Sequence, residues 1–171
     1  KWLAEVKAVD VAGLPEKLRH NLPDWLAALL KQELGDDFWA LVEAMERPAP
    51  LDLRVNALKA KREDALAQLT EAGVEAVATP YSPWGLRVAG KPALKPLAVF
   101  HRGAVEVQDE GSPLLAALLG PKRGEMVVDF CAGAGGKTLA LGAMMRNTGR
   151  LYAFDVSGHR LDALKPRLAR S

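Results

Sequence analysis

The sequence predicts an α/β protein built in three parts. Apolar residues first follow helical spacing, then alternate with polar residues, and finally form two short runs that each end in an acid, Asp129 and Asp155. Helical, alternating and strand–turn–helix patterns are typical of three different architectures. The predicted parts are a helical segment, a small α+β module and the start of an open parallel sheet, at residues 1–50, 51–103 and 104–171.

The first part is predicted to hold two helices that share a core. Asp24, directly after Pro23, is suited to cap the first helix, and Pro48-Ala49-Pro50 ends the second. Trp25 and Trp39 are expected in the core, since apolar residues at helical spacing usually face inward. The apolar positions are Trp25, Leu26, Leu29 and Leu30 in one helix and Phe38, Leu41, Val42 and Met45 in the other.

The second part reads as strand, helix, strand, strand. Leu51, Leu53 and Val55 alternate with polar residues, which predicts a half-buried strand. An amphipathic helix is expected at 62–72, ended by Gly73, and two short strands at 74–79 and 86–88 flank a turn. This order is typical of small α+β platforms that bind RNA, although the aromatic strand signature of base stacking is absent.

Charge singles out the same part as the best candidate for contact with phosphates. Residues 1–50 carry 6 basic and 9 acidic side chains, residues 51–103 carry 8 and 5, and residues 104–171 carry 9 and 7. The excess of +3 in the middle part is modest, so a solvated basic face is an equal alternative. The candidate RNA-contacting residues are Arg54, Lys59, Lys61 and Arg62.

The third part alternates strand and helix, which implies a parallel sheet. A strand at 105–107 and a helix at 113–119 come first, with Ser112 as the expected helix cap. The alternating elements that follow are a strand at 126–130, a helix at 136–146, a strand at 151–155 and a helix at 158–169.

Small residues follow the strand that ends at Asp129, and a second acid, Asp155, ends the next strand. This layout is typical of a nucleotide-type cofactor site, because small residues admit the ligand, a helix N-terminus offers free N–H groups, and the second acid reaches a ribose. S-adenosylmethionine, NAD or a nucleotide would fit. The dinucleotide fingerprint needs a third glycine where this chain has Thr138, and the Walker fingerprint needs its first glycine where this chain has Cys131. An ordinary strand–turn–helix junction is the remaining alternative.

Four ordered motifs resemble the RNA cytosine-5 methyltransferases of the NOL1/NOP2/Sun family. The segment from Asp129 to Thr138, Asp-Phe-Cys-Ala-Gly-Ala-Gly-Gly-Lys-Thr, is similar to the cofactor motif of that family. The other three are Leu53-Arg-Val-Asn56, Val107-Gln-Asp-Glu-Gly-Ser112, and Ala153-Phe-Asp155 followed by Arg160-Leu161. One departure is Ala134, where many members have proline.

The resemblance implies a Rossmann-like methyltransferase domain, S-adenosylmethionine as cofactor, and rRNA or tRNA as partner. Asp155 is then the ribose ligand, Asp129 braces the turn or faces the methionine part, and Cys131 is a small packing residue of the pocket. Asp109 and Glu110 lie near the cofactor or, equally, cap the following helix. The implied cofactor-binding residues are Cys131, Ala132, Gly133, Ala134, Gly135, Gly136, Lys137 and Asp155.

The same resemblance implies that no catalytic residue lies in this chain. Methyl transfer to C5 of cytosine needs a thiolate that adds to C6. The family takes it from a Pro-Cys motif, with a second cysteine in Thr-Cys, and neither dipeptide occurs here. We therefore expect the chain alone to be inactive. A noncatalytic RNA-binding module and a piece of an NAD-dependent oxidoreductase are the alternatives.

Composition agrees with a soluble, cytosolic protein of one or two domains. The 171 residues are 49% hydrophobic and 26% charged, with a net charge of +2 and one cysteine. No apolar run reaches the roughly 20 residues of a membrane span, and no His/Cys/Asp cluster has metal-ligand spacing. We expect no metal and a monomer. The start at Lys1 and the end at Ser171, after two βα units, suggest a truncated sheet.

Overall fold

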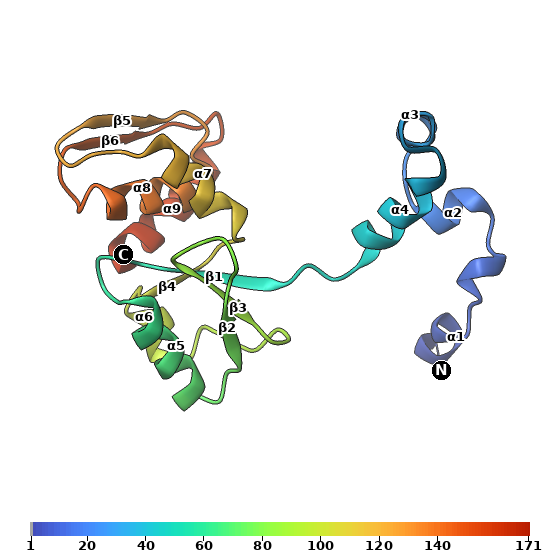
Figure 1. Ribbon diagram of the computed structural model, residues 1–171, viewed down its shortest axis with the longest axis horizontal. Helices are drawn as coiled ribbons and strands as arrows, with labels where there is room; N and C mark the ends of the chain where they lie inside the picture. The colour runs from blue at the N-terminus through green and yellow to red at the C-terminus, as the bar shows by residue number, and fades with distance from the viewer. Residues whose placement is uncertain (1) are drawn as a thin grey trace. The chain divides into compact units, whose positions relative to one another are not determined.

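The computed structural model describes residues 2–171, which form two compact units divided between Ala49 and Pro50 (Figure 1). The first unit is helical, as predicted. Its helices are α1 (Trp2–Lys7), α2 (Glu16–His20), α3 (Asp24–Leu34) and α4 (Phe38–Glu46), with single 3₁₀ turns η1 (Val11–Gly13) and η2 (Gly35–Asp37).

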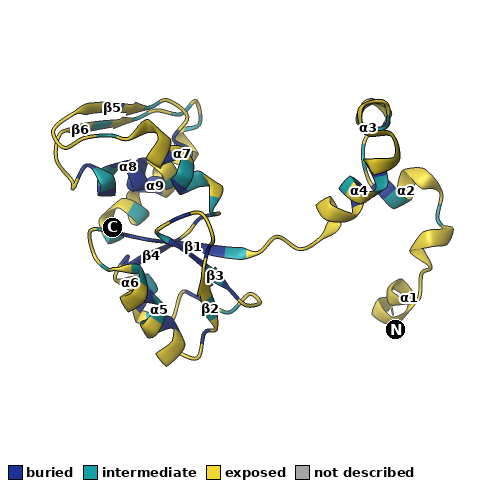
Figure 2. Cartoon of the chain, viewed as in Figure 1, coloured by how far each residue is buried: buried dark blue, intermediate teal, exposed yellow. Residues whose placement is uncertain are grey.

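A small core holds the first unit together, and most residues of this unit are exposed (Figure 2). Ala27, Phe38 and Val42 are buried, and Trp39 packs against them. The predicted core position of Trp25 is wrong: the residue is 67% exposed, whereas Ala27, two positions further along α3, is buried. The predicted cap is also wrong, because Asp24 is the first residue of α3 and its carboxylate accepts from Lys17 Nζ at 2.8 Å.

The second unit begins with a four-stranded antiparallel sheet in the order β2-β3-β1-β4. The fourth strand lies beyond residue 103, where the sequence predicts the end of the module. Two helices, α5 and α6, accompany the sheet (Figure 1). The bounds are β1 (Leu51–Val55), α5 (Arg62–Glu71), β2 (Ala76–Ala78), β3 (Gly85–Val88), α6 (Ala98–His101) and β4 (Val105–Val107).

Strand β1 is buried on both faces, so the prediction of a half-buried strand is wrong. Leu53 and Val55 pack in the core that α5 and α6 cover. Asp52 and Arg54, on the opposite face, are only 5% and 3% exposed. On that face Arg87 of the neighbouring strand β3 binds Asp52, and Ala140 and Ala143 from the later part of the unit lie beside Arg54.

The rest of the second unit is the predicted strand–helix alternation. Strands β5 and β6 pair in parallel, with Val127 opposite Leu151 and Asp129 opposite Ala153. Helices α7, α8 and α9 lie on one side of this pair (Figure 1), whereas Met126 and Val128 on its other side are exposed. The bounds are α7 (Gly111–Leu119), β5 (Met126–Asp129), α8 (Gly136–Met144), β6 (Arg150–Ala153) and α9 (Gly158–Arg170).

Across residues 2–171, none of the helices has the length and apolar character needed to cross a membrane.

Candidate functional site

The glycine-rich turn (residues 131–137) joins the carboxyl end of β5 to the first turn of α8. Gly133 and Gly135 have φ angles of +54° and +80°, which a residue with a side chain adopts at a cost. A Cβ at Gly135 would overlap the Leu164 side chain, whereas a Cβ at Gly133 would meet nothing within 4 Å. The turn is therefore packed on α9 at Gly135 and open at Gly133, where a ligand could approach the backbone.

Two acids at neighbouring strand ends hold this turn. Thr138 Oγ1 donates to Asp129 Oδ2 at 2.6 Å, so Asp129 braces the turn, one of its two expected roles. Asp155 accepts from the Gly133 N–H at 2.9 Å and from the Ser157 N–H at 2.8 Å. The hydrogen bonds from Ser157 and Gly133 lower the pKa of the Asp155 carboxyl below 3.8. Asp155 is therefore ionised at neutral pH.

The residues of the turn fit a nucleoside-type ligand. The first N–H groups of a helix have no intrahelical acceptor, so those of Gly136 and Lys137 can bind an anionic group. Each Asp155 oxygen uses one lone pair for the backbone and keeps another for a hydroxyl. Cys131 is exposed at the start of the turn, and its role as a small residue lining the pocket stays a prediction.

Sequence reasoning missed the residues that support this turn from behind. Arg167, in α9, donates from Nη1 to the Ala134 carbonyl at 2.7 Å and from Nε to Glu106 Oε2 at 3.0 Å. Arg170 also donates to Glu106, whose side chain is only 2% exposed. Glu106 lies in β4, 61 positions before Arg167 in the sequence, and nothing in the local pattern of either segment points to the other.

Asp109 and Glu110 have structural roles. The Asp109 carboxylate accepts from the Ser112 N–H at 3.1 Å and from Ser112 Oγ at 2.7 Å, so Asp109 caps the first turn of α7. Ser112 lies inside that helix and donates, so its predicted role as the cap is wrong. Glu110 accepts from the N–H groups of Tyr81 and Ser82 at 2.6 and 2.8 Å, which anchors the turn before β3.

The four candidate RNA-contacting residues differ in their freedom to meet a phosphate. Arg54 is 3% exposed and donates from Nε to Gln108 Oε1 at 2.6 Å, so its predicted place on a phosphate-binding surface is wrong. Lys59 is exposed but donates to the carbonyls of Arg102 and Arg170 at 2.8 and 2.6 Å. Arg62 donates to the Ser82 carbonyl at 3.1 Å.

Lys61, in contrast, is exposed, and among the described residues its ammonium group has no hydrogen-bond or ion-pair partner. In the same part of the chain, no three His, Cys, Asp or Glu side chains gather in a way that could hold a metal ion.

The fold and the site together define an α/β nucleotide-cofactor domain joined to a ferredoxin-like sheet. Two family models match the chain. Residues 22–95 match the ferredoxin-like domain of the RsmF/B-like methyltransferases, and residues 116–171 match the 16S rRNA methyltransferase RsmB/F model. The chain belongs to this family of rRNA methyltransferases, which confirms the resemblance that the motifs indicate.

Individual relatives agree with the family models. The ribosomal RNA small subunit methyltransferase B of Pasteurella multocida is 38% identical over 156 residues, which cover 91% of this chain and 34% of the relative. The crystal structure of PH0851 superposes with a TM-score of 0.85 at 33% identity, covering 98% of this chain and 39% of that one. A methyltransferase homolog from Pyrococcus horikoshii gives 0.81 at 32% identity, covering 95% and 53%.

The chain thus spans about a third of the length of the curated relatives that it matches.

Proposed function

We propose that this chain supplies the cofactor-binding turn and an RNA-facing module of an enzyme that methylates C5 of cytosine in ribosomal RNA. The observation that carries the proposal is the contact between Asp155 and Gly133, which places an ionised acid against an open glycine backbone where two parallel strands end. Open α/β sheets bind nucleotide-like ligands at this edge.

S-adenosylmethionine fits these groups better than NAD. The N–H groups of Gly136 and Lys137 suit the methionine carboxylate, and the Asp155 carboxylate suits the ribose hydroxyls. Thr138 stands where the dinucleotide fingerprint has its third glycine, and it is buried with its hydroxyl bound to Asp129. When bound, the cofactor would supply an electrophilic methyl group.

The chemistry at cytosine requires a further group. C5 becomes nucleophilic only after a thiolate has added to C6, and a base must later remove the C5 proton. Cys131 is the only thiol of the sequence, and it lies in the turn that we assign to the cofactor. The chain therefore positions the cofactor and contributes to RNA binding, while the nucleophile must come from outside these 171 residues.

The test is an NMR titration of the 171-residue chain, because chemical shifts report even weak binding. Added S-adenosylmethionine or its demethylated product should move the amide resonances of Gly133, Gly136 and Lys137. NAD at the same concentration should move them less. Tighter binding of NAD would overturn the cofactor assignment, and no response to any of the three would favour the noncatalytic RNA-binding alternative.

A further inference from the structure

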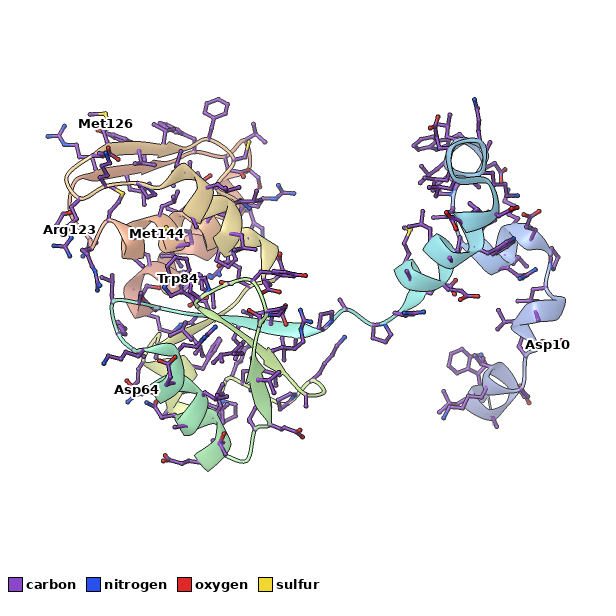
Figure 3. All side chains as sticks on the ribbon, in the orientation of Figure 1. Asp10, Asp64, Trp84, Arg123, Met126 and Met144 are labelled. Carbon is purple, nitrogen blue, oxygen red and sulfur yellow. The ribbon has the colours of Figure 1, made fainter. Side chains whose placement is uncertain are left out.

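A pocket lies in the second unit, between the antiparallel sheet and α8. It encloses about 250 Å³, and its walls are mostly apolar, with Trp84 on the sheet side and Met144 near the end of α8 (Figure 3). The α8 residues that line it are Ala140, Ala143 and Met144, which belong to the carboxyl half of the helix. The pocket does not include the glycine-rich turn, although Gln108, the partner of Arg54, lies beside Gly136 at the start of α8.

Arg54 is the buried charge of this pocket. Only 3% of the residue is exposed, and Nε is bound to Gln108. Its two Nη groups make no hydrogen bond to any other described residue, and Glu106, directly opposite Arg54 in β4, is bound by Arg167 and Arg170. Burial lowers the pKa of Arg54 to about 10, so the group is still charged at neutral pH. The Nη groups are not among the fully buried atoms that lack a partner, so they are accessible from the pocket and can donate to an acceptor there.

The remaining features favour a planar heterocycle with adjacent acceptors. The volume lies below the roughly 300–1,000 Å³ of pockets for drug-sized ligands, which suits a single ring system. Trp84 offers a stacking surface, and a guanidinium pairs best with the O6 and N7 acceptors of guanine. Arg146 lines the pocket, is exposed, and is held by its hydrogen bond to the Ala57 carbonyl at 3.2 Å, where it could meet a phosphate.

We propose that this pocket binds one unstacked guanine base of the RNA, stacked on Trp84 and read by Arg54. The inference rests on the proposed function in that it takes RNA as the partner. Because no residue of the glycine-rich turn lines the pocket, the base would be a neighbour of the methylated cytosine and not the cytosine itself. Such a contact would contribute to the choice of RNA site.

The probes are guanosine and adenosine 5′-monophosphate, which carry the same charge and differ at the ring edge that Arg54 would read. In an NMR titration of the 171-residue chain, guanosine monophosphate should move the Trp84 indole N–H resonance and the amide resonances of Ala57 and Arg146. It should bind at least about tenfold more tightly than adenosine monophosphate, because adenine presents a donor where guanine presents O6.

Two variants separate stacking from base reading. Trp84→Ala should weaken both nucleotides by about tenfold or more, whereas Trp25→Ala, in the first unit, is the matched control and should change nothing. Arg54→Lys keeps the charge but loses the forked donor, so it should remove the preference for guanine. If Arg54→Lys does not fold, the Trp84→Ala variant and the comparison of the two nucleotides still test whether the pocket binds guanine.

Equal affinity for the two nucleotides, or unchanged binding in Trp84→Ala, would overturn the guanine pocket. A parallel titration with S-adenosylmethionine keeps this result distinct from the proposed function. A chain that binds the cofactor but not guanosine monophosphate refutes only the pocket. A chain that binds guanosine monophosphate at Trp84 but no cofactor refutes only the methyltransferase assignment.

Discussion

Arg167 and the buried Glu106 form a partly buried ion pair, 3.0 Å from Nε to Oε2, that connects the parallel part of the second unit to its antiparallel sheet. The same guanidinium donates to the Ala134 carbonyl in the glycine-rich turn. One side chain therefore ties the candidate cofactor site to the candidate RNA-facing sheet. A substitution on either side of the pair should therefore alter the structure on the other side.

Glu106→Gln should test this connection. Removing one partner of a buried ion pair typically costs about 3–5 kcal/mol. We expect the lower end of that range, because the Arg167 and Arg170 side chains are each 22% exposed. Urea unfolding gives the loss of stability, and the amide resonances of Ala134 and Gly135 report any shift of the turn. Glu125→Gln, at an exposed acid, is the control; equal effects of the two substitutions would contradict the connection.

Asp155→Ala should weaken binding of S-adenosylmethionine by at least about tenfold, because the variant loses an ionised acceptor. The pKa of Asp155 lies below 3.8, so binding should not depend on this group between pH 5 and 8 and should be lost only as the pH falls through that lowered value. Titrations at several pH values measure both effects. Asp162→Ala, at an exposed acid of α9, is the matched control. Unchanged affinity in a folded Asp155→Ala variant would make the acid purely structural.

Asp52→Asn should destabilise the second unit at neutral pH. Asp52 is buried in β1 and accepts from Arg87 Nε and Nη2 at 2.8 and 2.9 Å. We expect a loss of about 1–2 kcal/mol, because the side chain of Arg87 is 42% exposed and solvent screens the pair.

The hydrogen bond from Arg87 also lowers the pKa of Asp52 below 3.8. Its stabilising effect is therefore complete above pH 3.8 and is lost as the pH falls through the lowered value. The difference in unfolding free energy between the native chain and Asp52→Asn should shrink below pH 3.8. A difference that is constant from pH 7 to pH 2.5 would show that the charge of Asp52 is not involved.

Neutralising Lys59, Lys61 and Arg62 together should weaken binding to 16S rRNA and flatten its salt dependence. Each lost phosphate contact should reduce the slope of log K against log salt by about 0.7–0.9. Lys61→Gln alone should give most of the change, because Lys59 and Arg62 already donate to backbone carbonyls. Lys122→Gln, also exposed, is the control. An unchanged slope in the triple variant would show that RNA binds at another surface.

The 171-residue chain should not methylate RNA. Incubated with labelled S-adenosylmethionine and 16S rRNA, it should give no 5-methylcytosine above background, since its one thiol belongs to the glycine-rich turn. Turnover that disappears in a folded Cys131→Ser variant would contradict both this expectation and the place we give to Cys131.

Local patterns predict most of the elements. Helix α5 and strands β5 and β6 lie within two residues of the expected bounds, because periodicity and turn residues such as Gly73 act over a few neighbours. The bracing role of Asp129 could likewise be anticipated, since its partner Thr138 is nine residues away, at the start of the next helix.

The failures have a common cause in tertiary packing. Arg54 and Asp52 look solvent-facing in an alternating strand, yet residues far along the chain cover them. Trp25 lies on the exposed face of α3, because the small core of the first unit accepts only the other face of that helix.

The sequence by itself determined the order of strands and helices, the position of the glycine-rich turn and the family to which the chain belongs, because these depend on residues close together in the chain. Only the tertiary structure decided that Glu106 meets Arg167, that Arg54 is buried, and that a pocket opens beside Trp84. These depend on contacts between residues far apart in the chain, 61 positions for Glu106 and Arg167 and 89 for the Arg146 side chain and the Ala57 carbonyl, and such contacts produce no periodic pattern in the sequence.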